Sequence, residues 1–442
     1  MLDKDKQKGH IGFLFTGLEG QCNPRHPIRQ LAHKIPWQVF EEELSCYYSK
    51  EGRPAKPIRL MVGLLILKQM HNLSDEGICQ AWRDNPYFQY FTGEVEFQWE
   101  LPCEPSDLTH FRNRIGEHGS LLILSVSAGL HQKQIEKEEV VLVDTTVQEK
   151  NITYPTDTKL AGKVIERSWQ LAEQENVKLR RSYRRVVKKC IEAQRGRNHP
   201  RGKKKAKQAT KVLQKIAGRL VRELERKLRP EQRAKHEEAL LLYKKVIKQK
   251  REDKDKVYSL HEPQVYCIAK GKEHKKYEYG SKAGLVIGAK SGVILAAHHI
   301  EKNQYDGHTL PAMLEQAEAV SGKFFKKVVG DQGFKGRVGI EGVEVMHPGQ
   351  KVKEAKEKKQ RKKLFKRRSS IEAVISHLKK AFRLGRNYLK GAIGDIINVQ
   401  MAAAAWNFKK WMREYFLNPI LRQAILRIAM IFFGSIASKY PF

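Results

Sequence analysis

Hydrophobic residues at helical spacing dominate the first part of the chain. The segment Ile58–His71 places leucine, isoleucine and methionine three and four residues apart, which predicts a buried helix. Asn72 and Leu73 interrupt this pattern, and Ser74 is a suitable N-cap for a second helix over Asp75–Arg83. Two helices joined by a tight turn are typical either of a helix-turn-helix or of a plain helical hairpin.

A third helix is predicted over Asp107–Ile115, with Ser106 as its start after Pro105. Its basic residues His110, Arg112 and Arg114 are expected either to face DNA or to point into solvent. Residues 1–115 are therefore predicted to form a helical N-terminal domain that binds DNA.

The pattern changes to that of strands from about residue 138. Val140–Val143 is a short apolar, β-branched run, and the polar stretch after it is able to continue the strand. Further strands are predicted over Lys276–Ile287, Gly292–Ile300, Phe325–Gly330 and Val343–Met346, with a crossover helix over Leu310–Val320. This order of strands and helices predicts a mixed α/β core over residues 138–158 and 257–412.

A long helical segment interrupts this core. Residues 159–256 are rich in charge and poor in turn signals, which predicts a basic helical insertion, with a loop at Gly202–Lys207. Residues 413–442 are predicted to form a C-terminal helical tail. Its apolar part, Ile420–Ile436, carries Arg422 and Arg427 and is too short to span a membrane, so a packing helix is expected.

The charge of the chain points to a polyanionic partner. Lys and Arg number 84 against 49 Asp and Glu, a formal net charge of +35. Such a surplus favours nucleic acid through counterion release, although a ribosomal or membrane-surface protein would share it. The 6 cysteines form no C-x-x-C pair, so we expect free thiols and a cytoplasmic protein with no membrane attachment.

Two apolar runs each lead directly into an aspartate. Asp144 follows Val140–Val143, and Asp331 follows Val328–Gly330. Taken singly, either aspartate is equally well explained as a turn residue or a helix cap. Because both occur in the same context, we expect two carboxylates together at one edge of the sheet, where ligands and metals bind.

A third acid, Glu372, lies in a basic helix. Ser369 and Glu372 fit a capping box, which would make the glutamate part of a helix start. Beyond it, Ile371, Val374 and Leu378 form a core-facing stripe, while Arg368, Glu372 and Lys379 share another face. An acid flanked by bases suits a metal ligand beside phosphate-binding groups. Asp157 and Asp306 are weaker candidates, since neither closes an apolar run. The pair His298–His299 is weaker too, because a histidine pair without a nearby carboxylate is more often structural.

In these residues the sequence resembles the DDE transposases of bacterial insertion sequences, of the group numbered five and its relatives. The motifs are Val143-Asp144-Thr-Thr-Val, Asp331-Gln-Gly-Phe-Lys-Gly336 and a Y-x2-R-x3-E-x6-K signature that falls on Phe365, Arg368, Glu372 and Lys379. Phe365 departs from the signature, so the phenolic hydrogen bond to phosphate is lost.

The resemblance implies a ribonuclease H-like fold in which Asp144, Asp331 and Glu372 are catalytic and hold two Mg²⁺ (or Mn²⁺) ions. It implies cleavage at the element's ends and strand transfer into target DNA by a homodimer bound to terminal inverted repeats, in a nucleoid-associated bacterial protein. The residues expected to bind DNA are Arg368, Lys379, Lys362, Lys363 and Arg367. Two alternatives stay open: a catalytically impaired, transposase-derived DNA-binding protein, and a structure-selective nuclease of the same fold.

Overall fold

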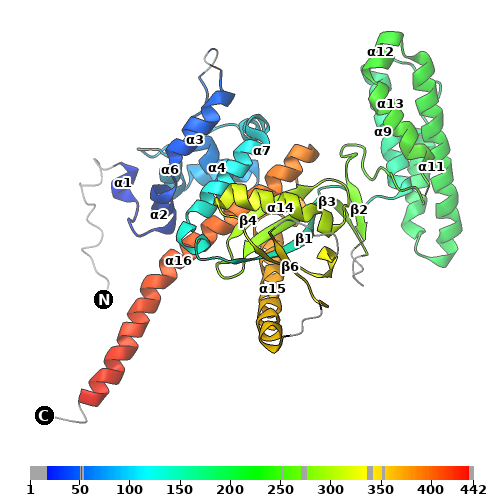
Figure 1. The fold of residues 1–442 in the computed structure, drawn as a ribbon. Coiled ribbons are helices and arrows are strands. Elements are labelled where there is room, and N and C mark those ends of the chain that lie inside the picture. Colours follow the sequence, from blue (N-terminus) through cyan, green and yellow to red (C-terminus); the bar gives the residue numbers. More distant parts are fainter. Residues whose placement is uncertain are drawn as a thin grey trace, which may run out of the picture. The chain divides into compact units, whose positions relative to one another are not determined.

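The computed structural model describes residues 17–49, 51, 54–250, 252–269, 276–335, 342–350 and 354–437, apart from the side chains of 357 and 416–437. It divides the chain into two compact units, residues 1–148 with 282–442 and residues 149–281. Figure 1 labels the elements of both units. Each unit is described by itself.

The N-terminal part of the first unit is helical, as predicted. Its elements are α1 (Leu18–Gln21), α2 (Pro27–Lys34), α3 (Trp37–Leu44), η3 (Ser45–Tyr47), α4 (Ile58–Met70), α5 (Asp75–Arg83), α6 (Pro86–Thr92), α7 (Pro105–Gly129) and α8 (Gln132–Ile135). Leu60 to Met70 of α4 are all buried, because a helix that is apolar on every side needs neighbours all round. The predicted N-cap is confirmed, since the Ser74 side chain accepts a hydrogen bond from Gly77 N.

The start of α7 differs from the prediction. The helix begins at Pro105, and its N-cap is Glu104 rather than Ser106. Glu104 and Asp107 form a reciprocal capping box, and proline suits the first helical position because it has no amide hydrogen to leave unpaired. Arg112 is neither solvated nor on an open surface: it is 5% exposed and pairs with Asp75.

A mixed sheet follows. Its strands are β1 (Val140–Lys150), β2 (Tyr266–Ala269), β3 (Tyr277–Gly288), β4 (Ile294–Ile300), β5 (Lys327–Val329), β6 (Glu344–Met346) and β7 (Arg386–Asn387). The order is β2-β3-β1-β5-β6, with β4 also paired to β3 and β7 to β1. β5 runs parallel to β1 and β6, whereas β3 and β4 are antiparallel. Each strand predicted from the sequence within this part of the chain is confirmed.

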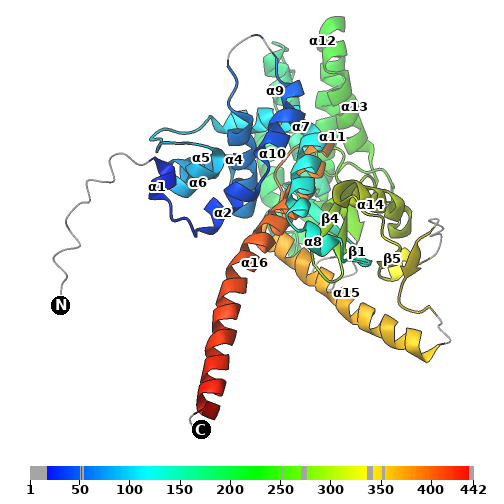
Figure 2. The same ribbon diagram turned by 60° about the vertical axis from the view of Figure 1, so that its left-hand side comes forward.

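Three helices cover this sheet. α14 (Asp306–Ser321) is the predicted crossover helix and packs on β4. α15 (Ala355–Ala381) contacts β5, and α16 (Gly391–Ala437) packs against α7, α4 and β4. One end of α15 and one end of α16 project from the rest of the unit in both views (Figures 1 and 2). Within the described residues, no helix is both long enough and apolar enough to cross a bilayer.

Two predictions about α15 and β1 are wrong. Because α15 is continuous from Ala355, Ser369 and Glu372 lie in mid-helix, and the Ser369 hydroxyl bonds to the Lys366 carbonyl instead of capping. Because β1 continues to Lys150, Asp144 lies inside the strand and not at its end. The neighbouring strand β5 ends at Val329, which pairs with Leu142. Asp144 therefore lies just beyond the last residue pair between the two strands.

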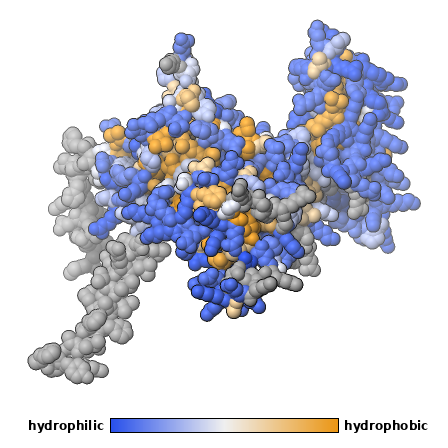
Figure 3. Space-filling view, in the orientation of Figure 1, coloured by the Kyte–Doolittle hydropathy of each residue, from blue (hydrophilic) through white to orange (hydrophobic). Residues whose placement is uncertain are grey.

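The second unit contains five helices among its described residues: α9 (Asp157–Gln174), α10 (Arg184–Glu192), α11 (Pro200–Lys227), α12 (Pro230–Lys235) and α13 (Glu237–Lys248), with η4 (Ala193–Gly196) between α10 and α11. Leucine and valine side chains such as Val164, Leu213 and Leu220 form its core. The loop expected at Gly202–Lys207 is wrong, since these residues lie in the first turns of α11 after Pro200. The face of this unit that is seen in Figure 3 is mainly hydrophilic.

Candidate active site

Asp144 lies on β1, and Asp331 lies two residues beyond the end of the adjacent parallel strand β5. Val140, Val141 and Leu142 of β1 pair with Lys327, Val328 and Val329 of β5. Continuing this register by two residues places Asp144 beside Asp331. A Cβ on Gly330 would lie 3.1 Å from the Val143 side chain, so the residues just before the two aspartates are also neighbours. Neighbouring strands lie about 4.8 Å apart, which brings the two carboxylates within reach of a shared ligand.

Local hydrogen bonds orient both carboxylates. Asp144 Oδ1 accepts from the backbone N–H of Thr145 at 2.7 Å. Asp331 is the N-cap of η5 (Gln332–Phe334), and its Oδ1 accepts from Gly333 N at 2.8 Å. Asp331 therefore does form the turn that was the alternative to a functional role. The hydrogen bond fixes the direction of its side chain and does not take the carboxylate out of the site.

Arg368 links Glu372 to Asp144. Arg368 lies one turn before it on α15, and Arg368 Nη2 is 3.2 Å from Glu372 Oε1. The other end of the same guanidinium, Nη1, is 3.7 Å from Asp144 Oδ2. The Glu372 side chain is 63% exposed, whereas those of Arg368 and Asp144 are 19% and 16% exposed. One cation thus joins two of the three predicted catalytic acids.

A fourth acid, Asp306, joins this group at the start of α14. Its Oδ1 accepts a hydrogen bond from the Thr145 hydroxyl at 3.0 Å and is ion-paired with Lys282 of β3. A Cβ on Gly333 would lie 2.7 Å from Asp306 Oδ2 and 2.9 Å from Asp331 Oδ1, so these two carboxylates face the same glycine. Sequence reasoning set Asp306 aside because it closes no apolar run. No signal in the sequence pointed to it, because the crossover helix was predicted to begin only at Leu310 and the contacts of Asp306 depend on the completed fold.

The predicted DNA-binding residues occupy different surroundings. Lys362 and Lys363 are exposed on α15, and Lys379 is half-buried two turns beyond Glu372. Arg367 is exposed but donates to the backbone carbonyls of Ala289 and Lys290 at the turn between β3 and β4. Its guanidinium therefore holds α15 against the sheet, whereas the two lysines face solvent.

The donor chemistry of the site suits a hard cation, although the side chains are not gathered around one. Carboxylate oxygens are the ligands that Mg²⁺ and Mn²⁺ prefer. Among the described residues, no three or more His, Cys, Asp or Glu side chains lie close enough together to hold a metal ion. Arg368 instead supplies the positive charge between Asp144 and Glu372.

Comparison with known families decides what kind of protein carries this site. Residues 17–114 match the model of a family described as a transposase domain (DUF772), and residues 244–408 match that of the transposase DDE domain. The chain belongs to the DDE transposases of insertion sequences. It is an enzyme of the transposase and endonuclease type, as the resemblance of its motifs predicted.

The matched ranges include two of the three catalytic candidates of this transposase. Asp331 and Glu372 lie inside the DDE range, and Asp144 precedes it. The transposase is also 42% identical over 188 residues to the uncharacterized protein ORF8 in the nfe locus of Rhizobium meliloti, a stretch that covers 42% of this chain and 91% of that protein. No solved structure matches the chain.

Phe365 of the transposase packs where the related signature has a tyrosine. It lies on α15 one turn before Arg368 and is half-buried against the hydrophobic core. A ring at this position therefore contributes packing without a hydroxyl. This packing explains why an aromatic residue occupies the position. The absence of the hydroxyl leaves the candidate acids themselves unchanged.

Proposed function

We propose that this transposase cuts DNA at the ends of its insertion sequence and joins the freed ends to target DNA, with Asp144, Asp331 and Glu372 as the catalytic acids. The observation that carries the proposal is the pairing of β1 with β5, whose register, continued by two residues, would bring Asp144 next to Asp331. The contact of Arg368 with both Asp144 and Glu372 supports the inclusion of the third acid.

We propose further that the core is ribonuclease H-like. In support, an antiparallel pair, β3 and β4, is followed in the sheet by β1 and by the parallel strands β5 and β6. Helix α14 connects β4 to β5 across the sheet. In this arrangement the acids of β1 and β5 and the helix α15 meet at one edge, with residues 159–256 as an insertion between β1 and β2.

The three acids would hold two Mg²⁺ (or Mn²⁺) ions. Bound there, the ions would activate a water or a 3′-hydroxyl and stabilise the leaving oxygen in an in-line displacement. The chain's own part is to orient the carboxylates, through the Thr145 and Gly333 amides. Arg368 is in place to exchange its carboxylate contacts for a phosphate oxygen, and Lys379 on the same helix would contact a neighbouring phosphate.

We propose that Asp306 is a positioning residue for this site. It touches Thr145, which follows Asp144, and it faces the glycine whose amide holds Asp331. Its ion pair with Lys282 fixes the carboxylate from β3. A single side chain therefore ties together the segments that carry both catalytic aspartates.

The DNA partners would be the terminal inverted repeats and the target. Lys362 and Lys363, exposed on α15, would contact backbone phosphates, and the N-terminal helices would carry repeat recognition. Because two element ends must be held together before strand transfer, the active form is proposed to be a homodimer on DNA.

The test is a cleavage and strand-transfer assay with labelled DNA that carries an element end. Wild-type protein with Mg²⁺ is expected to release the end and to yield joined 3′ products, while Asp144→Asn, Asp331→Asn and Glu372→Gln reduce both by at least about a thousandfold. Asp157→Asn, an exposed acid at the start of α9, is the matched control and should keep wild-type rates.

The same assay separates the two alternative functions. Cleavage without joined products would support a nuclease and overturn the proposed strand transfer. DNA binding without any metal-dependent cleavage would point to a binding protein. Cleavage that survives Asp331→Asn would remove the metal assignment itself.

A further inference from the structure

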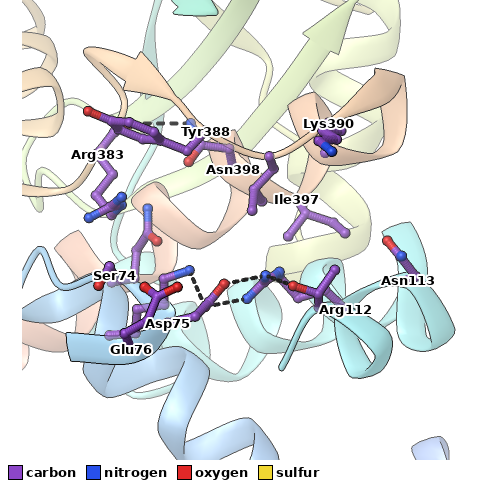
Figure 4. Close-up of a pocket in the computed structure, with 15 residues that line it drawn as sticks. Ser74, Asp75, Glu76, Arg112, Asn113, Arg383, Tyr388, Lys390, Ile397 and Asn398 are labelled. Carbon is purple, nitrogen blue, oxygen red and sulfur yellow. Dashed lines mark hydrogen bonds and ion pairs between the residues drawn. The ribbon is translucent and has the colours of Figure 1, made fainter. Parts of the chain in front are cut away.

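A cleft of about 650 Å³ separates the N-terminal helices from the segment that joins α15 to α16. One wall is formed by the first turn of α5 and by α7, which contribute Ser74, Thr109 and Asn113. The other wall contributes Arg383, Tyr388 and Lys390 (Figure 4). Both walls belong to the same compact unit.

The side chains in this cleft are those that bind nucleic-acid backbone. Serine, threonine, asparagine, tyrosine, arginine and lysine make most protein contacts to phosphate and sugar oxygens. Tyr388 is 56% exposed, and the Arg383 guanidinium lies 5.0 Å from the centre of its ring. Lys390 is exposed at the mouth. The cleft therefore offers hydrogen-bond donors and two cations in one place.

The balance of charge in the cleft is positive. Asp75 at its base is neutralised by Lys68 Nζ at 2.7 Å and by both terminal nitrogens of Arg112. Arg383 and Lys390 add two positive charges on the opposite wall, against the exposed acid Glu76. An anionic ligand fits this cleft, and Glu76 is the side chain that opposes it.

The backbone at Arg383 is strained. Its φ of 61° lies in the left-handed region, which glycine and asparagine adopt readily and arginine rarely does. Its guanidinium donates at 3.3 Å to the carbonyl of Asn72, itself left-handed with a φ of 57°. Strain of this kind persists where the surroundings hold it, and it is concentrated at functional sites. The strained turn aims the arginine across the cleft.

The cleft is connected to the catalytic strand. Asn398, one of its lining residues, donates to Gln148 Oε1 at 3.0 Å. Gln148 lies on β1, four residues after Asp144. At a rise of about 3.3 Å per residue this is roughly 13 Å. The buried Gln148 side chain therefore joins the lining of the cleft to the strand that carries Asp144.

We propose that this cleft binds the sugar–phosphate backbone of the DNA strand that leads to Asp144, with Arg383 and Lys390 as phosphate contacts. The inference rests on the proposed function for the identity of the strand. It adds a binding site away from the catalytic acids, formed jointly by the N-terminal helices and the core. Binding there requires no cleavage, so it is tested without metal.

The first test uses two substitutions that change the charge of the cleft in opposite directions. Lys390→Gln removes a cation from the mouth, and Glu76→Gln removes the opposing acid. Affinity for an element-end duplex is measured in EDTA over a series of salt concentrations with the full-length protein. Lys390→Gln should weaken binding about three- to tenfold and lower the salt dependence by about one phosphate, whereas Glu76→Gln should strengthen binding.

The control is Lys133→Gln, an exposed lysine on α8 outside the cleft, which should leave affinity unchanged. If Lys390→Gln binds as wild type does, or if Glu76→Gln fails to strengthen binding, the inference is overturned. Retained cleavage chemistry in such variants would leave the proposed function intact. Conversely, if the wild-type protein does not cut DNA but Lys390→Gln binds DNA more weakly than wild type, the cleft is supported and the proposed function is not.

The second test uses the strained position. Arg383→Gly removes the guanidinium and suits the left-handed backbone, so the melting temperature should stay within a few degrees of wild type. DNA affinity should nevertheless fall at least as far as in Lys390→Gln. Arg383→Gly that melts like wild type and also binds like it would contradict a phosphate contact at Arg383.

Discussion

Arg368 Nη1 lies 3.7 Å from Asp144 Oδ2, across the boundary between helix α15 and strand β1. The same guanidinium contacts Glu372, so it stands between two acids that are proposed to share metal ions. A cation between two carboxylates lowers their mutual repulsion, and a divalent ion bound there would do the same. The arginine and the metal are therefore expected to substitute for one another.

Arg368→Gln should make stability depend more strongly on metal. Without metal, loss of the two partly exposed ion pairs is expected to lower the free energy of unfolding by about 1 kcal/mol. Mn²⁺ should then raise the melting temperature of Arg368→Gln more than that of wild type, measured by thermal denaturation with EDTA or Mn²⁺. Arg368→Lys keeps the charge but not the planar guanidinium, so its Mn²⁺-induced shift in melting temperature should lie between those of wild type and Arg368→Gln. An equal Mn²⁺ shift in all three proteins would contradict the exchange.

Asp306→Asn should slow cleavage while leaving DNA affinity unchanged. The amide keeps the size of the side chain but loses the charge that pairs with Lys282 and faces Gly333. Residues that orient the groups around a metal site commonly contribute about 10–100-fold to activity. The measurement is the single-turnover cleavage rate beside the dissociation constant for the same DNA. A weakened affinity with a normal rate would assign Asp306 to DNA binding instead.

The local patterns of the sequence predicted most of the fold. Val140–Val143, Ile58–His71 and the strands after residue 276 appear where their periodicity placed them. The errors fall where a local signal competed with a longer-range one. Ser369 and Glu372 have the spacing of a capping box, but the basic residues before them are good helix formers and extend α15 back to Ala355. Gly202 likewise lies in a helix begun by Pro200.

The sequence contexts of Asp144 and Asp331 could be recognised from the chain alone, whereas Asp306 and the cleft could not. Asp144 and Asp331 each follow an apolar run, and such runs identify buried strands. Asp306 takes its place from packing between α14, β3 and the turn after β5, which no periodicity encodes. The cleft brings Ser74 and Lys390 together over more than three hundred residues of sequence. Contacts of that range depend on the completed fold.

Asp75→Asn should be strongly destabilising. Its carboxylate pairs with Lys68 and Arg112, whose side chains are only 9% and 6% exposed. Burial acts to raise the pKa of Asp75, but the hydrogen bonds from Arg112 and Lys68 outweigh it, and the pKa is lowered. Removal of this charge leaves two buried cations together, at a cost of about 3–5 kcal/mol in the free energy of unfolding. Denaturant titration measures it.

The control for Asp75→Asn is Asp84→Asn, which breaks an exposed pair with Arg83. That change should cost less than about 1 kcal/mol. Equal effects of the two substitutions would show that the buried group contributes no more than a surface ion pair.

His71 should make the protein sensitive to mild acid. Burial, with a smaller effect of Lys409, lowers the pKa of this imidazole from 6.5 to about 4. Among the described side chains, no hydrogen-bond partner faces its Nε2, and its ring lies 4.9 Å from that of Phe88. Because the unfolded chain binds the proton more tightly, stability is full above pH 6.5 and is lost as the pH falls towards 4.

His71→Leu should therefore flatten the dependence of stability on pH between 6.5 and 4, an effect on the order of 1–2 kcal/mol for a partly exposed group. Glu414→Gln provides the contrast. Burial acts to raise the pKa of Glu414, but hydrogen bonds from His131, Lys410 and Gln134 lower it to about 2, so its contribution is lost only below pH 4.5. Denaturant melts at half-unit pH steps would separate the two windows. A slope between pH 6.5 and 4 that persists in His71→Leu would show that the imidazole is not its source.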